Sequence, residues 1–126
     1  MRWTAGFGLI LVVLAATAAG AATPCSIHPK NGATDEELAA MAKVSMADAR
    51  KAALRSLKDA SKAIVEDAEL EVEDGCLVYS FDIAIKGKSG VQEIQVDAGT
   101  GKVLSSKHES PAAEKAEKAK DKPKSK

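Results

Sequence analysis

Residues 70–81 have the sequence LEVEDGCLVYSF, and this stretch decides the fold. Apolar and polar side chains alternate on both sides of Asp74-Gly75, which is typical of strands with one buried face. Asp-Gly between two such runs indicates a two-residue type I′ turn. That turn pairs Glu73 with Cys76 and, further along, residues 72, 70 and 68 with residues 77, 79 and 81, so that apolar residues meet apolar residues. The stretch therefore predicts an antiparallel hairpin built from residues 64–73 and 76–86.

The two faces of the first strand in this hairpin differ in their chemistry. The residues expected on the core face are Ile64, Ala68, Leu70 and Val72. The opposite face carries an acidic row made of Asp67, Glu69, Glu71 and Glu73. Like charges in a row cost stability unless cations neutralise them, and Lys86 or Lys88 could help from nearby strands. The row is therefore the candidate site for a cation or a basic partner, with a solvated sheet face as the alternative.

One amphipathic helix precedes the hairpin, and two short strands follow it. Ser45 suits an N-cap, with Asp48 three residues on. Apolar residues at spacings of three and four predict a helix over residues 46–60. Strands are expected at residues 91–97 and 103–106, joined by a turn in which Asp97 can hydrogen-bond the backbone. The predicted fold class is α+β, with one amphipathic helix packed on a three- to four-stranded antiparallel β-meander whose other face is polar and open to water.

The two ends of the chain differ in composition from this domain. Residues 1–21 have the form of a signal peptide, with Arg2, an apolar run and then small residues, and an uncleaved N-terminal anchor is the alternative. Residues 22–42 form a lead-in segment, in which Thr34 and Glu37 suit a capping box for a short helix. Residues 109–126 are rich in Lys, Glu and Ala and are expected to be a disordered tail.

Both cysteines, Cys25 and Cys76, follow the signal sequence, and the mature protein is expected to be periplasmic or secreted. An even number of cysteines in an exported chain is typical of a disulfide, and two free thiols are the alternative. Cys25 and His28 could instead contribute to a zinc site. Such a structural site needs four ligands, so Cys76 and His108 would have to converge on it.

Composition argues against several classes of function. The chain has 18 basic and 18 acidic side chains, so no global field attracts nucleic acid or a membrane surface. Aromatic residues make up 3% of the chain, which disfavours stacking on bases. No combination of nucleophile, base and orienting group is evident, and no phosphate-binding loop is present. We expect a protein that is not an enzyme and that uses no cofactor.

Three pieces of the chain, taken in order, resemble the PepSY domain. Residues 44–49, VSMADA, are similar to the family's helix opening, and residues 70–81 are similar to its strand-turn-strand. Residues 94–104, IQVDAGTGKVL, resemble its closing pattern of valine-aspartate, threonine-glycine and valine. The resemblance covers residues 43–108 and implies a free-standing exported single-PepSY protein without catalytic residues.

The resemblance also implies a kind of partner. PepSY domains occur in propeptides of thermolysin-like metallopeptidases and as free-standing exported proteins, with a proposed role in restraining peptidases. We therefore expect a binding module whose partner is another exported protein, a peptidase among the candidates, with no nucleic acid and with membrane contact only during export. The alternative is an envelope-associated structural protein tethered by its lysine-rich tail. A metal-handling protein is a third interpretation.

Overall fold

The structure is a computed structural model that describes residues 24–120 of the 126-residue chain. The predicted signal peptide, residues 1–21, lies outside the described residues. The elements are α1 (Asp35–Met41), α2 (Met46–Arg55), the 3-10 helix η1 (Ala60–Lys62), β1 (Ala63–Glu73), β2 (Cys76–Ile85), β3 (Val91–Asp97), β4 (Val103–Glu109) and α3 (Pro111–Lys120). Within the described part, no helix has the length and apolar character needed to cross a membrane.

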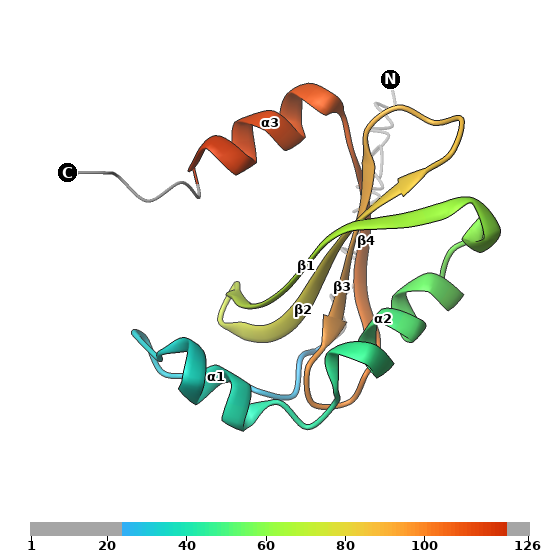
Figure 1. The fold of residues 1–126 in the computed structure, drawn as a ribbon. Coiled ribbons are helices and arrows are strands. Elements are labelled where there is room, and N and C mark those ends of the chain that lie inside the picture. Colours follow the sequence, from blue (N-terminus) through green and yellow to red (C-terminus); the bar gives the residue numbers. More distant parts are fainter. Residues whose placement is uncertain (1–23, 121–126) are drawn as a thin grey trace, which may run out of the picture.

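The four strands form one antiparallel sheet in the order β1-β2-β3-β4, with α2 and α3 on opposite sides of it (Figure 1). Sequential neighbours are joined by short turns, so the sheet is the predicted meander. The α+β fold class is confirmed. The sheet has an inner face that packs against α2 and an outer face that lies toward α3.

The β1–β2 hairpin has the predicted register. Glu73 pairs with Cys76, Leu70 with Tyr79 and Ala68 with Phe81. Asp74 and Gly75 have φ angles of 48° and 78°. Both values lie in the left-handed region that a type I′ turn requires, so the Asp-Gly signal identified this turn correctly.

A bulge at Glu66 corrects the face predicted for the start of β1. The pairing with β2 shifts between Val65 and Asp67, which leaves one extra residue in β1. One extra residue reverses which side chains point inward. Ala63 and Val65 therefore pack against the core, whereas Ile64 was predicted on the core face and is 63% exposed.

The core lies between α2 and the inner face of the sheet. Ala49 and Ala53 of α2 have no exposed surface, and their small side chains let the helix approach the sheet closely. The largest fully buried side chains of the inner face are Phe81, Leu77, Ile83 and Ile94. The predicted N-cap is confirmed, because the Ser45 Oγ accepts a hydrogen bond from the Asp48 N–H at 3.1 Å.

Helix α2 ends at Arg55, earlier than the predicted residue 60. The Ser56 hydroxyl donates to the Ala53 carbonyl at 2.6 Å, and the Ser56 N–H donates to the same carbonyl at 3.2 Å, so Ser56 caps the helix end. The chain then turns into η1 rather than continuing the helix. Leu57 still packs against the core from this turn, as its helical spacing indicated.

The lead-in segment is attached to the domain rather than free. Helix α1 starts with the predicted capping box, in which the N–H of Glu37 donates to Thr34 Oγ1 and the N–H of Thr34 donates to the Glu37 carboxylate. Leu38 of α1 belongs to the core and is 6% exposed. The Ile27 carbonyl accepts a hydrogen bond from the Leu77 N–H at 3.0 Å.

The C-terminal segment differs from the predicted disordered tail. Strand β4 runs to Glu109, and α3 follows it as a regular helix. The Ser110 Oγ accepts from the Ala113 N–H at 3.3 Å, and Glu114 pairs with Lys118 one turn later at 2.6 Å. Alanine, glutamate and lysine are strong helix formers, and the prediction gave more weight to the missing large apolar side chains than to this propensity. The prediction of disorder was wrong for residues 111–120, and residues 121–126 lie outside the described part.

Candidate functional site

The outer face of the sheet carries an acidic groove of about 240 Å³. Carboxylates from all four strands and from α3 line it. They are Asp67, Glu69 and Glu71 of β1, Asp82 of β2, Glu93 of β3, Glu109 of β4, and Glu114 and Glu117 of α3. Ser80 and Lys118 complete the lining. We call this surface the acidic groove.

Strand register brings these side chains together. Glu69 is paired with Ser80, and Asp82 is paired with both Asp67 and Glu93. Directly paired residues in neighbouring strands point to the same face, and this face is opposite to the one that holds Phe81 and Ile94. The acidic row predicted on one strand is therefore one edge of a wider acidic surface.

The structure places three of the four residues of the predicted row in the groove. Asp67, Glu69 and Glu71 line it, whereas Glu73 is exposed beside the hairpin turn and does not. The prediction missed Asp82 and Glu93, although their alternation with buried apolar neighbours placed both on the outer face. A partner-binding role for the row stays a prediction.

Helix α3 partly covers this face, which corrects the expectation that the face is open to water. Its Lys118 is the cation of the groove and also pairs with Glu114 of the same helix at 2.6 Å. Lys88, which was expected to help neutralise the row, pairs with Asp59 instead, at 3.1 Å. The groove therefore has one lysine among many carboxylates.

Burial and repulsion from neighbouring charges raise the pKa of three groove carboxylates, Glu71, Asp82 and Glu109. Burial, and then the neighbouring charge of Glu73, raise the pKa of Glu71 to about 7. Burial also raises the pKa of Asp82 and of Glu109 above their ordinary values. These carboxylates stand close enough to repel one another in water-poor surroundings, so a cationic group entering the groove would be favoured.

Three carboxylates of the acidic groove lie close enough to share a ligand. Carboxylate oxygens of Glu93, Glu109 and Glu117 are within 4.8 Å of one another. Oxygen donors of this kind suit protons, ammonium or guanidinium groups, and hard divalent cations.

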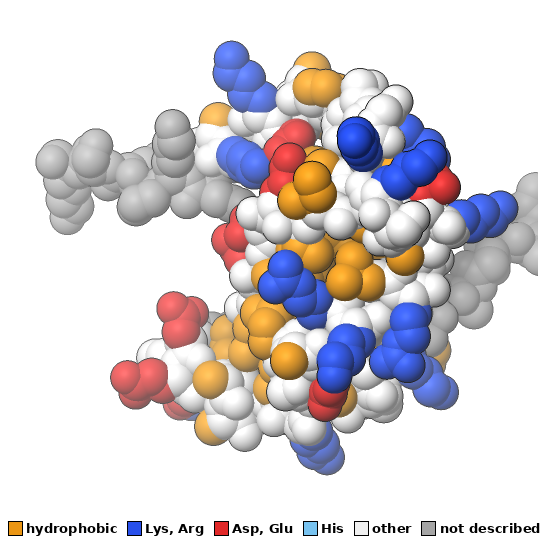
Figure 2. Space-filling model, turned by 45° about the vertical axis from the view of Figure 1, so that its right-hand side comes forward, with side chains coloured by type: hydrophobic (Ala, Val, Ile, Leu, Met, Phe, Trp, Pro, Cys, Tyr) orange, Lys and Arg blue, Asp and Glu red, His pale blue; other side chains and the backbone are white. Residues whose placement is uncertain are grey.

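The opposite side of the molecule is basic. On the side that carries α2, lysine and arginine side chains dominate the charged surface and surround patches of hydrophobic surface (Figure 2). The exposed basic residues of α2 and the turn after it are Arg50, Lys51, Arg55, Lys58 and Lys62. The formal net charge is zero because the acidic face and the basic face balance each other.

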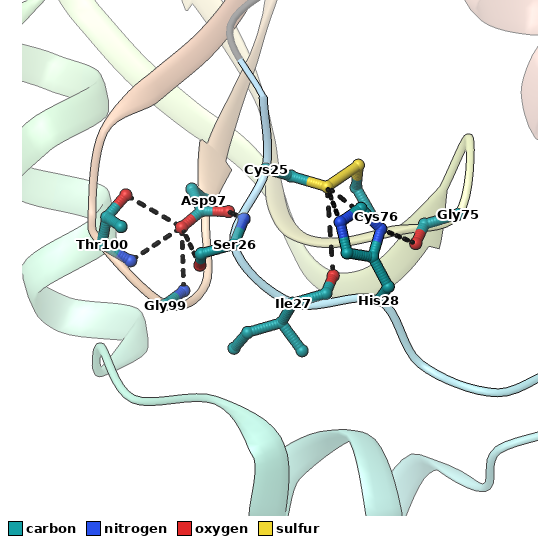
Figure 3. Close-up of a disulfide and its surroundings, with 9 residues drawn as sticks. All are labelled: Cys25, Ser26, Ile27, His28, Gly75, Cys76, Asp97, Gly99 and Thr100. Atoms are coloured by element: carbon teal, nitrogen blue, oxygen red, sulfur yellow. Dashed lines mark hydrogen bonds between the residues drawn. A yellow bond between two sulfur atoms is a disulfide. The ribbon is translucent and has the colours of Figure 1, made fainter.

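A second cluster surrounds the predicted disulfide, which is confirmed. Cys25 and Cys76 are bonded, with their Cα atoms 5.8 Å apart, so the alternative of two free thiols was wrong. His28 lies beside the bond (Figure 3), and its ring nitrogens are 3.7 and 3.8 Å from the Cys25 Sγ. His108 was considered as a ligand with these residues, but it lies in β4 opposite Gln92.

Asp97 connects the lead-in segment to the β3–β4 turn (Figure 3). Its carboxylate accepts hydrogen bonds from the Ser26 N–H at 2.9 Å and the Ser26 hydroxyl at 2.5 Å. It also accepts from the N–H groups of Gly99 and Thr100 and from the Thr100 hydroxyl. Burial would raise the pKa of Asp97, but the bonds from Ser26 and Thr100 outweigh it and lower the pKa to about 2. The turn is predictable from the sequence, whereas the link to Ser26 is not.

Comparison with known families accounts for the central part of the chain. A family model described as the peptidase propeptide and YPEB domain, PepSY, matches residues 43–107. No significant match was found among curated proteins or among solved structures. The matched segment contains α2, most of the sheet and the Asp97 turn, whereas Cys25, His28 and α3 lie outside it. Since the match spans just over half of the chain, the protein belongs to the PepSY family.

Proposed function

We propose that this protein is an exported, non-catalytic binding module whose acidic groove docks a basic segment of another exported protein, with a peptidase as the first candidate. The observation that carries the proposal is the convergence of carboxylates from four strands and α3 on one groove. The peptidase candidate is supported by the family, whose description refers to peptidase propeptides.

The chemistry of the groove suits lysine and arginine side chains. Glu71 and Glu93 are partly or largely buried, so a cation beside them would be less screened than at an open surface. Charge-assisted hydrogen bonds to carboxylates are about twice as strong as neutral ones. Lys118 of α3 lines the groove and pairs there with Glu114, which supports a lysine side chain as a ligand.

The test compares two triple variants that change the formal charge equally. The first, Asp67→Asn with Glu69→Gln and Glu71→Gln, neutralises the β1 side of the groove. The control neutralises exposed acids elsewhere, at Asp35, Glu36 and Asp48. Each chain, starting at residue 22 and carrying a photo-crosslinker in β1, is incubated with exported peptidases of the source organism. Cross-linking and residual peptidase activity are then measured.

We expect the unaltered chain and the control to cross-link and inhibit a peptidase, and the groove variant to lose most of both effects. Equal cross-linking by the two triple variants would exclude the groove as the binding surface. A further chain that ends at Ser110 lacks α3, which contributes no buried residue. The strand carboxylates of the groove remain in this chain, so it should still bind the peptidase. If it instead loses association with anionic wall or membrane material, the alternative of a tail-tethered envelope protein is favoured.

A further inference from the structure

The side chains of Cys25, His28 and Cys76 form a compact group of nitrogen and sulfur atoms. Their ligand atoms all lie within 4.8 Å of one another (Figure 3). In the structure the two sulfurs are bonded to each other, so neither is a thiolate. The group lies outside the acidic groove, and two of its three residues, Cys25 and His28, lie outside the segment matched by the family model.

The tautomer of His28 leaves one ring nitrogen able to bind a metal ion. Its Nδ1 is 3.2 Å from the Gly75 carbonyl oxygen, which can only accept a hydrogen bond, so Nδ1 carries the proton. The lone pair is then on Nε2, which is 3.8 Å from the Cys25 Sγ. Metal-binding histidines characteristically donate their other N–H to a backbone carbonyl in this way, which fixes the tautomer and the ring orientation.

We propose that reduction of the Cys25–Cys76 disulfide creates a site for a thiophilic cation, with Zn²⁺ as the model ion, formed by the two thiolates and the His28 Nε2. Tetrahedral zinc with Zn–S near 2.3 Å and Zn–N near 2.0 Å places neighbouring S and N ligands about 3.6 Å apart. The observed separation of 3.8 Å between Nε2 and the Cys25 Sγ is close to this value. Thiolate and imidazole donors together favour soft or borderline cations over Ca²⁺ and Mg²⁺.

The scaffold keeps the three residues close without the disulfide. Ser26 is held by two hydrogen bonds to Asp97, and the neighbouring Ile27 carbonyl accepts from the Leu77 N–H. These contacts hold the segment that contains Cys25 and His28 against the start of β2, where Cys76 lies. Breaking the S–S bond therefore frees the sulfurs to separate while their backbones stay in place.

The redox step balances with an external dithiol as reductant. The dithiol transfers two electrons and two protons to the disulfide, giving two cysteine thiols and an oxidised dithiol. Binding of the cation then releases the two thiol protons, because the ligands are thiolates. Three protein ligands leave the fourth position to water or to an outside donor, which is the arrangement of an exchangeable rather than a closed structural site. Oxidation re-forms the disulfide and removes both sulfur ligands.

The test uses the chain from residue 22 onward in oxidised and reduced forms under anaerobic conditions. Zn²⁺ affinity is measured by competition with a chromophoric chelator, and Co²⁺ replaces zinc to reveal thiolate-to-metal charge-transfer absorption. The matched variants are His28→Ala and His108→Ala. Circular dichroism of each reduced sample before metal is added checks that it is folded.

We expect one tightly bound Zn²⁺ per reduced chain, none at the same affinity in the oxidised chain, and a thiolate–cobalt band. His28→Ala should weaken binding by about tenfold or more, whereas His108→Ala should leave it unchanged. The oxidised chain also reports any binding by the carboxylates of the groove. Equal Zn²⁺ affinity of the reduced unaltered chain and reduced His28→Ala would overturn the proposal, as would a folded reduced chain without the charge-transfer band.

Discussion

Asp97 is a single residue on which two distant segments depend. It is 1% exposed and accepts hydrogen bonds from Ser26 and from the turn at Gly99 and Thr100. Ser26 is one residue from the disulfide and two from His28, so Asp97 also positions the Cys25–His28 cluster. The aspartate of the family's closing pattern therefore has a structural role in this chain.

We expect Asp97→Ala to lower the free energy of unfolding by about 3 kcal/mol, because it removes a buried acceptor and leaves several donors unpaired. Ser26→Ala should cost about 1 kcal/mol, since it removes only one donor. Urea unfolding at pH 7 measures both changes. An equal loss in the two variants would contradict the central role of the carboxylate.

The same carboxylate makes stability depend on acid. Its pKa is about 2 in the folded chain against an ordinary value of 3.8. Because the folded-state value is the lower one, the stabilisation of about 2 kcal/mol is complete above roughly pH 4 and is lost as the pH falls toward 2. Asp97→Asn should remove this part of the acid dependence, which unfolding curves between pH 2 and pH 5 would reveal.

At the scale of elements, two turns of the sheet require glycine for different reasons, at Gly75 and at Gly90. Both glycines have positive φ, of 78° and 73°. A Cβ at Gly75 would meet no atom within 4 Å, whereas a Cβ at Gly90 would overlap the carbonyl oxygen of Glu109 in β4. Glycine is therefore needed at position 75 only for its backbone conformation. At position 90 it is also needed because a side chain would collide with the neighbouring strand.

We therefore expect Gly75→Ala to cost about 1 kcal/mol and Gly90→Ala about 2–4 kcal/mol, because overlap adds to the same backbone strain. Thermal unfolding of both variants under one set of conditions provides the comparison. A Gly90→Ala variant no less stable than Gly75→Ala would show that β4 moves away without cost.

At the scale of the whole molecule, the acidic groove opposes folding at neutral pH. Glu71 holds its proton up to about pH 7 in the folded chain, well above the ordinary value of 4.5. The folded state therefore binds more protons than the unfolded state between these values, and stability falls as the pH rises through this window. A surface kept at this cost is consistent with the proposed binding of a cationic partner.

We expect Glu71→Gln to stabilise the protein at pH 8 relative to the unaltered chain and to flatten the decline in stability between pH 5 and pH 8. Urea unfolding at a series of pH values measures this dependence. The exposed Glu36 of α1 provides the matched control, and Glu36→Gln should leave the decline unchanged. If stability still declines with pH in Glu71→Gln, other carboxylates of the groove cause the decline.

Several features follow from the sequence because they depend on neighbours along the chain. The turn at Asp74-Gly75, the alternation on both sides of it and the capping residues Ser45 and Thr34 each act within a few residues. These signals were enough to predict the hairpin register, the α+β fold and the starts of α1 and α2. The disulfide could be named because the chain has two cysteines.

Other features were decided only by the tertiary structure. The bulge at Glu66 reversed the face of Ile64, because its position depends on how β1 meets β2. The acidic groove required the register of four strands and the position of α3 together. The contacts of Ser26 with Asp97 and of His28 with Gly75 join residues more than forty positions apart. Local preferences act over a few residues, whereas such long-range contacts are selected by the packing of the whole core, and for this reason the sites of this protein were harder to predict than its fold.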